Sequence, residues 1–145
     1  MRRWLANVAH MDLTLSTCFV LVHDPDLALA FYKDTLGLEV RKDVANGDFR
    51  WITVGGTAQP GVGIVLTNYL NGSPADNDQL AALLAKGALN GVHFSSDDLD
   101  AAYALVRDAG AEIIQEPTEQ FWGAKDFAVR DPSGNMVRIE QQPGA

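Results

Sequence analysis

The chain has 145 residues, of which 47% are hydrophobic, and this is enough apolar material for one compact domain or two small modules sharing a core. Its formal net charge of -8 argues against nucleic acid as a partner, because phosphate binding needs clustered lysine and arginine. An acidic balance either attracts a cationic ligand or only keeps the protein soluble. No apolar run approaches the roughly 18 residues of a membrane helix, and the N-terminus lacks a signal-peptide core, so we expect a cytoplasmic protein with no membrane partner.

Cys18 is the only cysteine, so no internal disulfide can form. It stands in an apolar segment, residues 18–22, that favours a strand. This setting predicts a core position for Cys18 rather than a nucleophile.

A repeat organises the chain. A segment that begins with aspartate and ends with glycine runs from Asp24 to Gly37, and a similar one runs from Asp97 to Gly110, 73 residues further on. Two copies at a fixed offset predict a tandem of similar half-domains. The seam between such halves is where side chains from both copies can converge on a ligand.

The first half is predicted to be a β-α-β-β-β unit. A strand over 17–23 precedes a helix that Asp24 caps, with Pro25 at its first position. Leu27, Ala30 and Phe31 are expected on one face of that helix, and Gly37 ends it. Three strands follow, over 38–44, 49–54 and 61–68, with a turn at 46–48.

The second half repeats this plan after a short amphipathic helix, residues 76–86. Asp97 or Asp98 caps its helix, Gly110 ends it, and strands are expected over 89–95, 112–116, 125–129 and 135–141. The predicted organisation is an N-terminal arm (1–14), a first module (15–70), a linker (71–88) and a second module (89–141). Either the native chain starts at Met11, or the first ten residues form an arm that reaches a partner subunit.

Two motifs, in this order and with this repetition, resemble a known family. Ala-Phe-Tyr-Lys-Asp-Thr-Leu-Gly at 30–37 and Asp-Pro-Ser-Gly-Asn at 131–135 are similar to segments of the vicinal oxygen chelate superfamily, which includes glyoxalase I, extradiol dioxygenases, fosfomycin-modifying enzymes and bleomycin-resistance proteins. The resemblance covers roughly residues 15–141 and implies an α+β fold. Two tandem βαβββ modules would form a cup-shaped mixed sheet with helices outside, and two chains would complete the cups as a homodimer.

The resemblance also implies where a metal would bind. Metal-dependent members place one histidine, glutamate or glutamine on each of four cup-facing strands, and these places fall on Thr17, about Val65, Gly91 and Arg138. None of the four side chains is a suitable ligand, and a guanidinium repels a cation. We therefore expect no metal and no other cofactor.

Alternation along the strands predicts which side chains face the cup. They would be Thr17, Phe19, Leu21, Gly63, Val65, Thr67, Gly91, His93, Ser95, Met136, Arg138 and Glu140. Arg138 and Glu140 either orient a ligand or form a salt bridge at the rim. The two glycines at 63 and 91 either leave room for a ligand or accommodate neighbouring atoms.

Aromatic and titratable residues complete the candidate site. His93 is either a general base, with Glu140 as the other catalytic candidate, or an ordinary hydrogen-bonded histidine. Trp51 and the pair Phe121-Trp122 either stack on a ligand or fill the core. The predicted ligand-binding residues are Thr17, Phe19, Trp51, Val65, Gly91, His93, Trp122 and Arg138.

These expectations favour a protein that binds a small organic molecule, cationic or aromatic, without a metal, as drug-sequestering resistance proteins do. The alternative is a lyase, isomerase or dioxygenase of the same superfamily, with or without a metal. A third possibility is a vestigial cup in a subunit that serves only for interaction.

Overall fold

The computed structural model describes residues 11–68 and 71–144. The first module comprises β1 (Thr17–Leu21), α2 (Pro25–Leu29), the π-helical turn η1 (Ala30–Thr35), β2 (Glu39–Asn46), β3 (Phe49–Gly55) and β4 (Gly63–Thr67). The helix α3 (Pro74–Ala85) follows. The second module comprises β5 (Asn90–Ser96), α4 (Leu99–Asp108), β6 (Glu112–Glu119), β7 (Lys125–Arg130) and β8 (Met136–Gln141).

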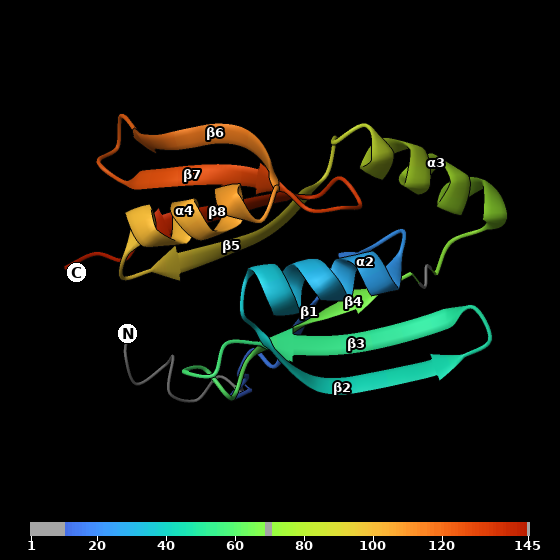
Figure 1. Ribbon diagram of the computed structural model, residues 1–145. Coiled ribbons are helices and arrows are strands. Elements are labelled where there is room, and N and C mark those ends of the chain that lie inside the picture. The colour runs from blue at the N-terminus through green and yellow to red at the C-terminus, as the bar shows by residue number, and fades with distance from the viewer. Residues whose placement is uncertain (1–10, 69–70, 145) are drawn as a thin grey trace, which may run out of the picture.

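Both modules have the same topology. Their four-stranded sheets run in the order β1-β4-β3-β2 and β5-β8-β7-β6. In each sheet the first strand is parallel to the last, and the other pairings are antiparallel. Figure 1 shows the two sheets as separate units, the second module above the first, each with its own helix across one side. The predicted α+β fold with two βαβββ modules is confirmed.

No helix in the described part of the chain is long and apolar enough to span a membrane. The longest described helix, α3, has 12 residues.

The first helix departs from its predicted face. The Asp24 carboxylate caps it as expected, accepting hydrogen bonds from the backbone N–H groups of Asp26 and Leu27 at 3.0 and 3.1 Å. The helix then widens into the π-helical turn η1, which rotates the side chains that follow. Ala28, Phe31 and Tyr32 are buried, whereas Leu27 is 55% exposed.

The linker helix begins earlier than predicted. Ser73 caps α3 in a reciprocal capping box with Asp76, and Pro74 occupies the first turn. The expected start at Asp76 is therefore wrong. The helix begins at Pro74, because its cap is Ser73. Of the helix side chains only that of Leu84 is buried, so the amphipathic face is narrow.

The expected core position of Cys18 is also wrong, since the residue is exposed. Cys18 shares a side of β1 with the buried Val20, but β1 is an edge strand of its sheet. A side chain near the free end of an edge strand has fewer neighbours to cover it than one in a central strand.

The seam between the modules is built around the buried carboxylate of Asp131. Its Oδ1 accepts from the backbone N–H groups of Ser133, Gly134 and Asn135, each at 2.9 Å. Its Oδ2 accepts from the Asn135 amide at 2.9 Å and from the Tyr32 hydroxyl at 2.7 Å. Tyr32 belongs to the first module and Asp131 to the second, so this one group joins the two halves.

Two further bonds cross the same seam. The backbone N–H of His23 donates to the Ser133 hydroxyl at 2.9 Å, and the Asn135 amide donates to the Leu21 carbonyl at 2.8 Å. Burial, followed by the charge of Asp131, raises the pKa of Tyr32 well above its usual value. The phenol therefore remains a neutral donor to the carboxylate.

We predict that Tyr32→Phe lowers the free energy of unfolding by about 1–3 kcal/mol, because it removes a hydrogen bond to a buried charged group. Urea denaturation followed by circular dichroism measures the change. The matched control is Tyr103→Phe, since the Tyr103 ring packs on Phe127 of the same module at 5.3 Å between centroids. Its effect should stay within about 0.5 kcal/mol. Equal effects of both substitutions would contradict the role of Asp131.

Candidate functional site

The first sheet presents an open face on the side away from the helices. Its core-facing side chains, among them Val20, Ile52 and Leu66, are buried in the cluster that joins the modules. Because side chains alternate along a strand, the residues directly before and after these core residues face the opposite side of the sheet. We call this the apolar face, and its members are Phe19, Val44, Trp51, Thr53, Val65 and Thr67. Of these, Val65 and Thr67 are buried. Two rows of paired residues build it, Phe19 beside Val65 beside Thr53, and Thr67 beside Trp51 beside Val44.

An aromatic pair dominates the apolar face. Phe19 and Trp51 meet edge to face, with ring centroids 5.2 Å apart and ring planes at 86°. The indole N–H donates to the Thr53 hydroxyl at 3.2 Å, which fixes the ring orientation. Phe19 is nevertheless 63% exposed, so the second module of the same chain does not cover it.

The second sheet presents a polar face on its corresponding side. Alternation and register bring His93, Arg138, Ala128 and Gln115 into one row, and Ser95, Glu140, Asp126 and Thr118 into the next. We call these eight residues, together with Gln120, the polar face. The predicted partners His93, Arg138 and Glu140 are therefore brought to one side of the sheet.

Asp126 is the centre of the polar face and is 1% exposed. Its Oδ1 accepts from Gln120 at 2.8 Å, from Gln115 at 3.0 Å and from Arg138 at 3.1 Å. Burial by itself raises the pKa of the Asp126 carboxyl, but the hydrogen bonds from Gln120 and Gln115 and the charge of Arg138 outweigh it. The net result is a pKa below the usual value, and the carboxylate stays ionised.

The ion pair of Arg138 differs from the one weighed from the sequence. Its guanidinium bonds to Asp126 and to the Gln115 side-chain oxygen, and it lies 3.8 Å from the Met136 sulfur, rather than pairing with Glu140. Sequence reasoning missed Asp126, Gln115 and Gln120. The available signal was the alternation of β7, which puts the charged Asp126 on the same side of the strand as Ala128, directly before the apolar run 127–129.

The remaining predicted site residues lie at the margins of these faces. Thr17 pairs with Gly63 at the start of β1. Trp122 is 61% exposed, in the loop between β6 and β7. It shares a hollow of about 410 Å³ with Glu140 at the end of the second sheet. The structure therefore brings Phe19 to Trp51 and Trp122 to Glu140, as two groups in different modules.

The space beside the strand glycines Gly63 and Gly91 is occupied by backbone atoms of neighbouring strands. A Cβ at Gly63 would lie 3.0 Å from the Val54 carbonyl, and one at Gly91 would lie 2.9 Å from the Met136 carbonyl. These approaches favour the second of the two interpretations of the glycines, that they accommodate neighbouring atoms.

The four places at which the resemblance would put metal ligands carry side chains that do not fit a divalent cation. Val65 and Gly91 donate nothing, Thr17 offers only a hydroxyl, and the Arg138 guanidinium is a permanent cation. Within residues 11–68 and 71–144, no group of three or more histidine, cysteine, aspartate or glutamate side chains could hold a metal ion.

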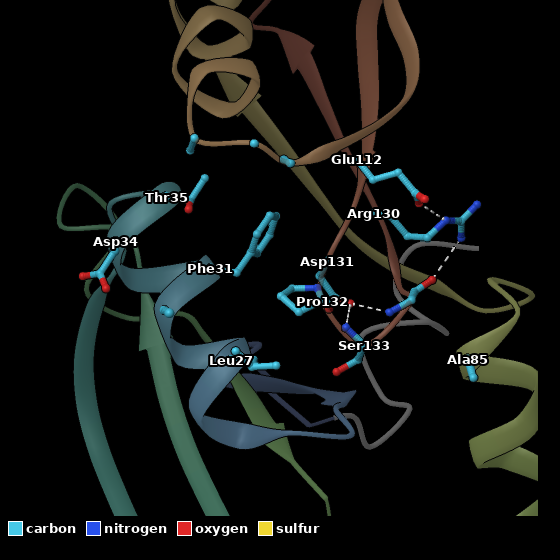
Figure 2. A pocket seen from close by; sticks show the side chains of 15 residues that line it. Leu27, Phe31, Asp34, Thr35, Ala85, Glu112, Arg130, Asp131, Pro132 and Ser133 are labelled. Carbon is cyan, nitrogen blue, oxygen red and sulfur yellow. Dashed lines mark hydrogen bonds and ion pairs between the residues drawn. The ribbon is translucent and has the colours of Figure 1, made fainter.

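A larger hollow, about 640 Å³, lies on the helix side of the molecule. Figure 2 shows it between the first helix, with Leu27 and Phe31, and the turn carrying Asp131 and Pro132. Arg130 in its wall is held by Glu112 at 2.8 Å and by the Gly134 carbonyl at 3.0 Å. Since this guanidinium is already held by a carboxylate and a carbonyl of the second module, we place the candidate site on the sheet faces instead.

The fold and the motifs match a family model. Residues 14–139 match the Glyoxalase/Bleomycin resistance protein/Dioxygenase superfamily, and the chain belongs to this superfamily. The resemblance stated from the sequence is therefore confirmed.

Individual proteins are similar over most of their length. The crystal structure of UcmS2 is 32% identical, with a TM-score of 0.80, and the match covers 90% of this chain and 98% of that one. TnmS3, an antibiotic binding protein from Streptomyces sp. CB03234, is 25% identical, with a TM-score of 0.72 and coverage of 91% and 98%. The protein YurT of Bacillus subtilis (strain 168) is 33% identical over 125 residues, which cover 85% of this chain and 94% of YurT.

We predict that Asp126 stabilises the fold at neutral pH and that this stabilisation is lost in acid. The folded-state pKa lies below the unfolded value of about 3.9, so the carboxylate stabilises the fold above that pH. This contribution is lost as the pH falls through the folded-state pKa. Asp126→Asn should cost about 1–2 kcal/mol at neutral pH, and the difference from the wild type should shrink below about pH 4. Urea denaturation at a series of pH values measures it.

The control is Asp43→Asn, which removes an exposed ion pair with Arg50 of 2.6 Å. Such a pair contributes at most about 1 kcal/mol. A difference between wild type and Asp126→Asn that stays constant from neutral to acid pH would contradict the assignment of an ionised, stabilising carboxylate.

Proposed function

We propose that this protein binds a small organic molecule with aromatic character in a cup lined by the apolar and polar faces, without a metal. The observation that carries the proposal is the Phe19–Trp51 pair, two rings held edge to face on the first sheet, with Phe19 63% exposed. Exposed aromatic surface of this kind is costly in water and serves recognition. The likeness to TnmS3, an antibiotic binding protein, supports a role in drug sequestration.

The same proposal includes a homodimer, because the two faces cannot close on each other within one chain. The helix sides of both modules share one core, and the Asp131 seam fixes them there. Phe19 and His93 consequently remain exposed on opposite modules. A second copy would supply the missing wall, so that the apolar face of one protomer meets the polar face of its partner and the dimer contains two equal cups.

We expect a thermal-shift screen of antibiotics and aromatic metabolites to find stabilising ligands, with about 2.7 kcal/mol of stabilisation at a ligand concentration of 100 Kd. The shift should persist after treatment with a chelator. Trp51→Ala should weaken binding about tenfold or more, because it removes the stacking surface. Leu105→Ala is the control, since Leu105 is an exposed apolar residue on the opposite, helix-covered side of the molecule.

Stoichiometric metal in the purified protein, or a ligand shift abolished by the chelator, would contradict metal-free binding. It would favour the lyase, isomerase or dioxygenase alternative.

We predict that binding-deficient variants of the two faces complement each other. Trp51→Ala damages the apolar face and Arg138→Met damages the polar face, so each homodimer should bind weakly. In a mixed dimer one cup carries both substitutions and the other carries neither. Unfolding and refolding an equimolar mixture should restore tight binding in about a quarter of the cups, measured by titration calorimetry.

Recovery is absent if each cup is built within one chain, because every cup would then keep one defect. A monomer in sedimentation analysis would also reject the shared cup. Either result leaves the binding of aromatic molecules to be judged by the thermal-shift screen alone.

A further inference from the structure

Several hydrogen-bond donors of Arg138 on the polar face have no oxygen acceptor among the described residues. Its Nη1 donates to Gln115 at 3.2 Å and to Asp126 at 3.1 Å. Its Nη2 has only the Met136 sulfur at 3.8 Å, and its Nε has no acceptor among the described residues. A guanidinium has five N–H donors and does not lose its proton. The side chain is 23% exposed, so an incoming molecule can reach the unused donors.

The guanidinium is also fixed in orientation. Asp126 binds Arg138 and is itself held by the amides of Gln115 and Gln120, and the Gln115 oxygen accepts from Arg138 in return. The Gln120 side-chain amide also donates to the Gln115 side-chain oxygen at 3.4 Å, so the side chains of Arg138, Asp126, Gln115 and Gln120 form one closed network. A network in which each buried member is bonded holds its side chains in a single arrangement.

The charge of the polar face determines which acceptor suits these donors. The carboxylate of Asp126 pairs with Arg138 through one oxygen, and Glu140 adds a second carboxylate on the same side of the sheet. An anionic ligand group would meet two carboxylates for one guanidinium. A cationic group offers no acceptor to the unused Arg138 donors and is repelled by the guanidinium, so these donors are best met by a neutral oxygen acceptor.

We propose, as an extension that rests on the proposed function, that Arg138 is the specificity-determining residue of the cup and binds a neutral carbonyl oxygen of an aromatic ligand. Asp126, Gln115 and Gln120 are positioning residues that hold the guanidinium for this contact. The apolar face supplies stacking, and the polar face selects the ligand by its carbonyl group.

The test uses three probes of equal size that differ in one group, 1-naphthamide, 1-naphthoate and 1-naphthylmethylammonium. Titration calorimetry with the full-length wild type should show the amide binding about tenfold more tightly than either charged probe, the advantage of a hydrogen bond to a charged donor. Tighter binding of the naphthoate, equal affinities, or no binding of the amide would each overturn the proposal. Equal affinities would do so while leaving aromatic binding intact.

The variants separate selectivity from stacking. Asp126→Asn/Arg138→Met removes one charge of each sign and leaves no lone buried charge, and it should abolish the amide advantage. Trp51→Ala should weaken all three probes by a similar factor and keep their ratio. If the double variant does not fold, Arg138→Lys retains a cation beside Asp126 and should reduce the amide advantage at least severalfold. A retained amide advantage in either Arg138 variant would overturn the proposal.

Discussion

The arrangement of the whole chain depends on one buried carboxylate. Asp131 accepts five hydrogen bonds, four from its own turn and one from Tyr32 in the other module. The four local bonds make the turn rigid, and the fifth attaches the turn to the first helix. A buried charge is tolerated only when it is bonded in this way, so the two modules keep the relative position that satisfies it. The Asp-Pro-Ser-Gly-Asn motif is thus the joint between the halves.

That joint has a consequence for recognition. Since the helix sides of both modules are buried together, the opposite sides of both sheets stay open. One open side is rich in apolar and aromatic groups and the other is polar. Duplication of a βαβββ unit has therefore produced two similar scaffolds whose exposed faces have diverged in chemistry, and a ligand held between them would meet a stacking wall and a hydrogen-bonding wall.

The polar face, like the seam, is organised around a buried carboxylate that accepts several hydrogen bonds. Asp126 has three donors on one oxygen, two of them neutral amides and one a guanidinium. Neutral donors let the carboxylate stay ionised without cancelling all of the Arg138 charge through a bidentate pair. Arg138 stands at one of the places where the resemblance would put a metal ligand, and its guanidinium has spare N–H groups that can donate hydrogen bonds.

The sequence by itself determined the duplicated topology, the cap at Asp24, and the positive-φ glycines Gly37 and Gly110 that end both helices. These features depend on contacts within a few residues and on strand alternation, which also assigned Phe19 and Arg138 to the sheet faces. The sequence left the second cap open between Asp97 and Asp98, and the structure selects Asp98. Only the tertiary structure decided that Arg138 pairs with Asp126, that Leu27, which precedes the π-helical turn, points outward, and that Cys18 is exposed. Each of these depends on register between strands distant in sequence or on packing between modules, and no local pattern encodes the distance between such groups.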